Sequence, residues 1–284
     1  FFNDTATIEF YNFPIGRSSD LATMGIPHLG HGISYAESPI GVGFTQKVRI
    51  GGYRVSAAHA LIHPLINPAL PTYNPKLTVL TGAIVTKFDV DKKNNDNLGK
   101  IKRVFFVYES EEQSIDAKEE FVLAAGAIHS PKILLLSGVG PAADLEALGI
   151  EVVIDEPGVG INLQDHPVVP MVVEGYDPNF PNKKVDAQNL SPESQALWFG
   201  QQAGYLTVAA TPLHAYWKSS PTKEYIDSQV LLFDGVPFLS WPNNNVMFPV
   251  CVDVDSPSRG KVSLMSKNFQ HDPIIDYGFY YDPT

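Results

Sequence analysis

The run Gly138-Val139-Gly140-Pro141-Ala142-Ala143 has the lettering of a phosphate-binding turn. Such a turn needs its glycines directly after a strand and at the start of a helix, so that backbone N–H groups and the helix dipole meet the phosphates. Here the preceding residues, KILLLS, continue a helix that begins at Ser130-Pro131. We therefore expect a helix-to-helix turn, and interpret Gly158-Val159-Gly160 as a turn for the same reason.

The histidines could bind a metal only in groups. His28 and His31 lie in a glycine-rich stretch with no nearby carboxylate. His59 and His63 are four residues apart on a predicted helix, but no glutamate stands between them, as the metalloprotease pattern requires. No metal site is therefore expected.

No residue of the chain is assigned a catalytic role. No serine stands in a Gly-x-Ser-x-Gly elbow, and the single cysteine, Cys251, lies in an apolar run typical of a buried hydrophobe. His129 and His166 are explained by local hydrogen bonding. The aromatic residues Phe233, Phe238 and Trp241 surround a Gly-Val-Pro turn, where they either pack at the base of a loop or line a substrate cavity.

The composition limits the classes of partner. The chain has 284 residues, 44% of them hydrophobic, which is enough for one large or two ordinary globular domains. Its formal net charge of −11 repels phosphate backbones, so nucleic acid is not expected as a partner. The longest apolar stretches fall far short of the ~18 residues of a membrane span. The oligomeric state stays open.

The hydrophobic pattern predicts a mixed α/β and α+β chain. Residues 1–50 are rich in loops, and a domain boundary is expected near residue 166. The apolar run 121–125, closed by Gly126, is typical of a strand covered on both faces. The other predicted strands are 77–80, 84–90, 101–108, 151–154, 168–174, 245–254 and 260–266, with an exposed loop at 91–100 and helices at 56–65, 130–136, 142–148 and 192–202.

We expect the sequence to be truncated at both ends. Residue 1 is Phe with no basic or apolar leader after it, and residues 280–284 complete no predicted element. Localisation is undetermined, although the sequons at Asn3 and Asn189 and the single cysteine favour export.

The string VLAAGAIHSPKILLLSGVGPAADLEALGIEVVIDEPGVGINLQDHP, residues 122–167, closely resembles the second signature region of the glucose-methanol-choline (GMC) oxidoreductases and the Asn-Leu-Gln-Asp-His that follows it. The flanking runs RVSAA from Arg54, LTVLTGAIV from Leu77 and SPSRGKVSLMS from Ser256 resemble family segments in the same order. The N-terminal Gly-x-Gly-x-x-Gly strand and the segment with the catalytic histidine have no counterpart. The chain therefore resembles an internal fragment of such an enzyme.

The resemblance implies a partial FAD-binding domain of the Rossmann type with a β-meander, at 51–165, and a substrate domain with an antiparallel sheet, at 166–284, with 1–50 bridging them. It implies an FAD-dependent oxidation of the CH–OH group of a small alcohol, inactive in this fragment alone. Val85 matches the valine whose backbone meets the FAD adenine, and Ala124, Ala125 and Gly126 match a strand end beside the cofactor. A hydroxynitrile lyase or a non-catalytic protein on the same scaffold is the alternative.

Overall fold

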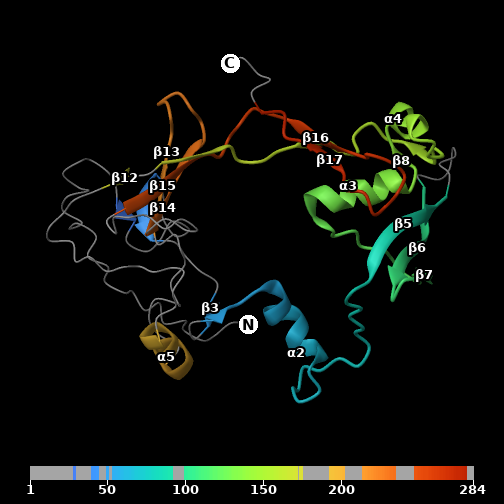
Figure 1. The fold of residues 1–284 in the computed structure, drawn as a ribbon, viewed down its shortest axis with the longest axis horizontal. Coiled ribbons are helices and arrows are strands. Elements are labelled where there is room, and N and C mark those ends of the chain that lie inside the picture. Colours follow the sequence, from blue (N-terminus) through green and yellow to red (C-terminus); the bar gives the residue numbers. More distant parts are fainter. Residues whose placement is uncertain are drawn as a thin grey trace. The chain divides into compact units, whose positions relative to one another are not determined.

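The computed structural model describes residues 28–29, 40–44, 49–50, 53–91, 99–171, 173–174, 192–201, 213–234 and 246–279 (Figure 1). The chain divides into two compact units, which are described separately. Unit 1 takes its described residues from Phe1–Leu77 and His166–Asp255, and unit 2 from Thr78–Asp165 and Ser256–Thr284. The predicted domains 51–165 and 166–284 do not coincide with these units, because residues 53–77 group with unit 1 and residues 256–279 with unit 2. In unit 2, residues 260–263 pair with residues 161–163. What each unit binds stays a prediction.

A three-stranded antiparallel meander opens unit 2, with strand order β5-β6-β7. The predicted bounds of its first two strands are confirmed, but the predicted strand at 77–80 is wrong, because those residues form no strand. The third strand was not predicted, since all its residues are exposed and only Ile115 among them is apolar. The strands are β5 (Ile84–Val90), β6 (Ile101–Tyr108) and β7 (Glu111–Asp116).

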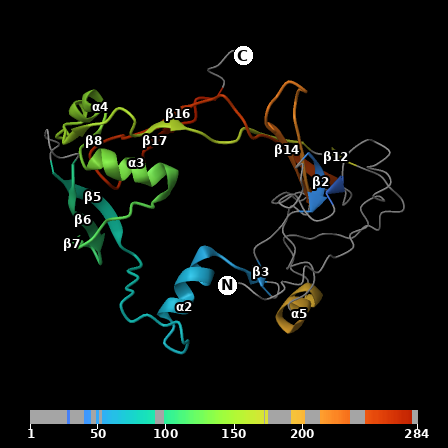
Figure 2. The ribbon, with the colours of Figure 1, turned by 180° about the vertical axis from the view of Figure 1, so that it is seen from behind.

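Helix α3 (Gly126–Leu136) lies beside β5, as Figures 1 and 2 both show. The expected start, with Ser130 as N-cap and Pro131 as first residue, is five residues too late. Ser130 instead reaches back to the helix start, where its Oγ accepts a hydrogen bond from the Ala125 N–H at 3.1 Å. At the other end, the buried Ser137 Oγ donates to the Ile133 carbonyl at 2.6 Å. Pro131 is therefore inside the helix and not its first residue.

The predicted strand at 121–125 is not formed. These residues form no regular element, no described strand pairs with them, and Val122 is 78% exposed. A continuous apolar run suits a strand between two neighbours, but the ladder needs those neighbours to exist. The run therefore enters α3 as an exposed segment.

The remainder of unit 2 packs around Leu135, Leu145 and Leu264. As predicted, the run from Gly138 to Ala143 connects two helices, although it includes a two-residue strand. A side chain at Gly140 would collide with Leu135, so packing explains this glycine without a phosphate. The elements are β8 (Val139–Gly140), α4 (Ala142–Ala147), β9 (Ile154–Asp155), β10 (Ile161–Leu163), β16 (Gly260–Ser263) and β17 (Ile274–Asp276).

Unit 1 is built on a mostly antiparallel seven-stranded sheet of order β1-β2-β13-β14-β15-β11, in which β12 also pairs with β15. This confirms a mixed fold with antiparallel sheets. The strands are β1 (His28–Leu29), β2 (Gly41–Phe44), β11 (Val168–Pro170), β12 (Val173–Glu174), β13 (Leu213–Trp217), β14 (Ser228–Asp234) and β15 (Val246–Asp253).

The rest of the described part of unit 1 consists of a short hairpin and helices. The predicted helix at 56–65 is confirmed as a π-helical turn followed by a short α-helix. No described helix is long and apolar enough to cross a bilayer. The elements are β3 (Arg49–Ile50), β4 (Tyr53–Arg54), η2 (Ala58–Ile62), α2 (His63–Ile66) and α5 (Pro192–Gln201).

Candidate functional site

Val85 lies on β5, at the open edge of the meander. Val85 is 38% exposed, and it lies opposite Phe106 of β6. Tyr108 and Glu111 close a two-residue turn, because Glu109 and Ser110 between them both have positive φ angles (51° and 66°).

That turn fixes the direction of every backbone group on β6. Neighbouring residues of an antiparallel ladder point alternately to the two sides, and the pair that closes a two-residue turn is hydrogen-bonded. The N–H and C=O of Tyr108 therefore point towards β7. Those of Phe106, two residues earlier, point the same way. Val85 is opposite Phe106, so its own N–H and C=O point away from β6 towards the open edge. A peptide N–H beside a C=O can pair with a base that carries an acceptor beside a donor.

Ala124, Ala125 and Gly126 lie at the exposed entry to α3. Gly126 has a φ of +81°, and a side chain built on it would have no heavy atom within 4 Å. Ala125, the N-cap residue, has no polar side chain that could cap the helix, and the first turn holds no acidic residue. The start of this 11-residue helix is therefore open to close approach by another group, and its dipole favours an anion there.

The two candidate regions belong to one packed body. The Phe88 N–H on β5 donates to Ser137 Oγ at the end of α3, at 2.7 Å. The Phe88 ring also meets the Phe121 ring edge-on, with centroids 6.1 Å apart, just before the exposed segment. Val85, Ala124, Ala125 and Gly126 are all exposed among the described residues, and this exposure is compatible with a nucleotide at either place.

Of the predicted aromatic wall, the structure describes only the backbone of Phe233. Phe233 lies on β14 opposite Phe248 of β15. Phe238 and Trp241 lie outside the described residues. Their role at a substrate cavity stays a prediction.

A polar cluster on β13 and β14 was not singled out from the sequence. The Gln229 side-chain amide donates to the Tyr216 hydroxyl oxygen at 2.5 Å and lies 3.4 Å from His214 Nδ1. Burial raises the pKa of Tyr216, so the phenol stays protonated and can itself donate. Because side chains alternate along a strand, the sequence could have suggested that His214 and Tyr216 share one face of β13. That Gln229 of β14 lies beside them depends on how the two strands are aligned.

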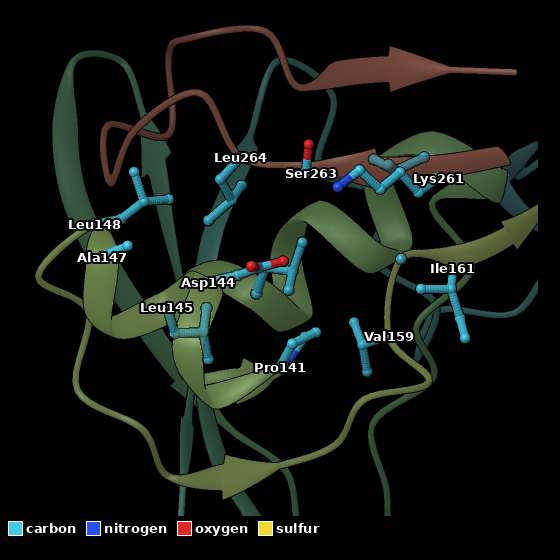
Figure 3. A pocket seen from close by; sticks show the side chains of 13 residues that line it. Pro141, Asp144, Leu145, Ala147, Leu148, Val159, Ile161, Lys261, Ser263 and Leu264 are labelled. Atoms are coloured by element: carbon cyan, nitrogen blue, oxygen red, sulfur yellow. The ribbon is translucent and has the colours of Figure 1, made fainter. Parts of the chain in front are cut away.

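A cavity of about 230 Å³ opens between α4, β10 and β16 (Figure 3). Its lining is mostly apolar, with Asp144 from α4 and Lys261 from β16 as the charged members. It contains none of the predicted site residues. The lining is Leu135, Pro141, Asp144, Leu145, Ala147, Leu148, Val159, Gly160, Ile161, Lys261, Val262, Ser263 and Leu264.

The histidine pair on η2 and α2 is held by a local contact. His59 Nδ1 lies 2.9 Å from Ser56 Oγ, and the His59 and His63 rings are 4.5 Å apart. Within the described ranges, no group of three or more possible metal ligands is found.

Asp227, in the connection before β14, has a strongly perturbed carboxyl group. Its carboxylate accepts hydrogen bonds from the Ser219 hydroxyl and, at 2.7 Å, from the Ser219 N–H. These bonds, helped by Ser228 and Lys223, lower the pKa of Asp227 from 3.8 to about 2. The residue is buried and ties the connection between β13 and β14 together, which is a structural task.

Comparison with known proteins finds a family model and named relatives that are similar to this chain. The GMC oxidoreductase family model matches residues 34–168. The chain is 30% identical over 246 residues to choline oxidase of Arthrobacter globiformis, covering 83% of this chain and 38% of that protein. It is 30% identical over 255 residues to an alcohol dehydrogenase [acceptor] of Pseudomonas putida, covering 86% and 43%. The chain thus spans about two fifths of the length of these relatives.

Solved structures share the fold. A formate oxidase superposes with a TM-score of 0.74 at 19% identity, covering 92% of this chain and 48% of that one. Pyridoxine 4-oxidase from Mesorbium loti superposes with a TM-score of 0.66 at 23% identity, covering 91% and 45%.

Proposed function

The chain belongs to the GMC oxidoreductase family, and from this premise we propose that it forms part of an FAD-dependent oxidoreductase acting on the CH–OH group of a small alcohol. Relatives named choline oxidase and alcohol dehydrogenase support an alcohol as substrate. The observation that carries the cofactor part is the open edge of β5 at Val85, inside the residues that the family model matches.

Val85 would hold the adenine of FAD through its backbone. Its N–H would donate to a ring nitrogen, and its C=O would accept from the exocyclic amine. Ala124, Ala125 and Gly126 would let the cofactor approach the start of α3, because no large side chain stands there. When bound, the flavin supplies the acceptor for the two electrons and the hydrogen removed from the alcohol carbon.

Unit 1 would supply the substrate side. Its antiparallel sheet carries Phe233 and the cluster of His214, Tyr216 and Gln229, and the Tyr216 hydroxyl could donate to a substrate oxygen. Phe238 and Trp241 would complete an apolar wall. No residue of the chain is proposed as the catalytic base, and the 284 residues alone are expected to oxidise no alcohol.

A comparison of FAD with FMN tests the proposal. FAD and FMN share the isoalloxazine ring, but only FAD carries adenine, so the chain should bind FAD more tightly than FMN in equilibrium dialysis. Equal affinity, or none at millimolar flavin, would contradict the assignment of the cofactor. Anaerobic addition of choline or a primary alcohol to the loaded chain should leave the flavin yellow, and bleaching would refute the expected inactivity.

A further inference from the structure

Strand β5 has one residue more than β6 between Val85 and Lys87. Val85 is opposite Phe106 and Lys87 is opposite Phe105, so Thr86 has no partner of its own and forms a β-bulge. Thr86 is only 8% exposed, and its Oγ1 donates to the Phe105 carbonyl at 3.2 Å. The side chain thus fastens the bulge to the neighbouring strand.

The bulge changes which way the backbone of β5 points. Phe88 directs its N–H away from β6, since that group donates to Ser137 Oγ. In a regular strand, residues three apart point to opposite edges. The extra residue at Thr86 puts Val85 and Phe88 on the same edge, so that one edge both attaches β5 to α3 and leaves the Val85 peptide groups open.

We propose that Thr86 is a positioning residue of a nucleotide site, because its bulge turns the N–H and C=O of Val85 towards a purine base that has an acceptor beside a donor. This inference rests on the proposed function. Adenine has that arrangement, with a ring nitrogen next to an amine. Hypoxanthine reverses it, since its carbonyl accepts where adenine donates and its ring N–H donates where adenine accepts.

This reversal of donor and acceptor allows the base contact to be tested by comparing ADP with IDP. ADP and IDP carry the same ribose and phosphates, so the ratio of their affinities reports on the base edge alone and cancels changes in phosphate contacts or in the folded fraction. Matched and mismatched polar contacts at a desolvated edge differ enough to predict an ADP preference of about tenfold in the unmodified chain.

Two substitutions separate the hydroxyl from the rest of the side chain. Thr86→Val keeps the shape and β-branching but removes the donor to Phe105, and it should bring the ADP-to-IDP ratio below about threefold. Thr86→Ser keeps the hydroxyl and should retain most of the ratio. A ¹H–¹⁵N spectrum of each variant checks that unit 2 stays folded and shows whether the Val85 amide signal moves.

The outcomes distinguish the two levels of the proposal. If the unmodified chain binds neither nucleotide at millimolar concentration, or binds both equally, the proposed function fails and this inference fails with it. If the unmodified chain prefers ADP and Thr86→Val keeps the full preference while folded, the role of Thr86 is refuted and the proposed function stands. Loss of preference in Thr86→Val with retention in Thr86→Ser supports the inference.

Discussion

Replacing Ser137 by alanine should loosen the attachment of β5 to α3. The Ser137 hydroxyl is buried, accepts the Phe88 N–H at 2.7 Å and donates to the Ile133 carbonyl at 2.6 Å. Ser137→Ala leaves the Phe88 N–H, on a residue that is itself buried, without an acceptor. An unsatisfied buried donor costs about 1–3 kcal/mol, so unit 2 should lose free energy of unfolding in that range.

Ser130→Ala is the matched control. Ser130 also accepts a backbone N–H, that of Ala125, at 3.1 Å, but the bond is exposed. Water can replace the lost hydroxyl there, so the cost should be about 0.5 kcal/mol or less. The two variants remove the same atom from the same helix and differ in whether solvent reaches the abandoned donor.

Amide hydrogen exchange is the suitable assay, because it reports the local opening free energy of β5 separately from unit 1. The Phe88 amide should exchange about five- to 150-fold faster in Ser137→Ala, since each 1.4 kcal/mol is a factor of ten and the expected loss is about 1–3 kcal/mol. Urea unfolding of unit 2 should show a matching decrease. Equal exchange at Phe88 in Ser137→Ala and the unmodified chain would refute the reasoning, as would an equal loss in Ser130→Ala.

Two further predictions concern other parts of the structure. Because the folded-state pKa of Asp227 is lowered from 3.8 to about 2, the charged carboxylate stabilises the fold above pH 4, and this contribution is lost as the pH falls through 2. The difference in thermal midpoint between the unmodified chain and Asp227→Asn should therefore shrink between pH 4 and pH 2, and a constant difference would contradict it. Gly160→Ala should destabilise unit 2 by more than about 3 kcal/mol in urea unfolding, because the new side chain would collide with the Val262 carbonyl at a φ of +86°. Gly149→Ala, at a φ of +68° with open space around it, should cost only about 1–2 kcal/mol, and equal costs would count against the collision.

Strands with a strong apolar pattern could be predicted from the sequence. Residues 84–90 and 101–108 are rich in β-branched and aromatic residues, and both form strands with those bounds. Strand β7 escaped prediction because an exposed edge strand needs no apolar face, and its turn uses Glu109 and Ser110 where Asn and Gly are usual.

Features that depend on a neighbouring strand could not be predicted. The run 121–125 has the composition of a buried strand, yet a strand requires a neighbour, and no described segment pairs with it. The bulge at Thr86 appears only when β5 is aligned with β6, because nothing in its own sequence marks the extra residue. Val85 was identified by resemblance, while the direction of its peptide groups followed from the register of three strands.

The central claim is that Val85 and the start of α3 lie alongside the adenine half of a flavin nucleotide. Titration of the ¹⁵N-labelled chain with millimolar ADP, followed by amide chemical shifts, tests it most directly, with FMN as the ligand that lacks adenine. ADP should move the Val85 and Gly126 amide signals, whereas FMN should leave that of Val85 in place. If ADP shifts neither signal, or if FMN shifts the Val85 amide signal as much as ADP does, adenine does not bind at this strand edge.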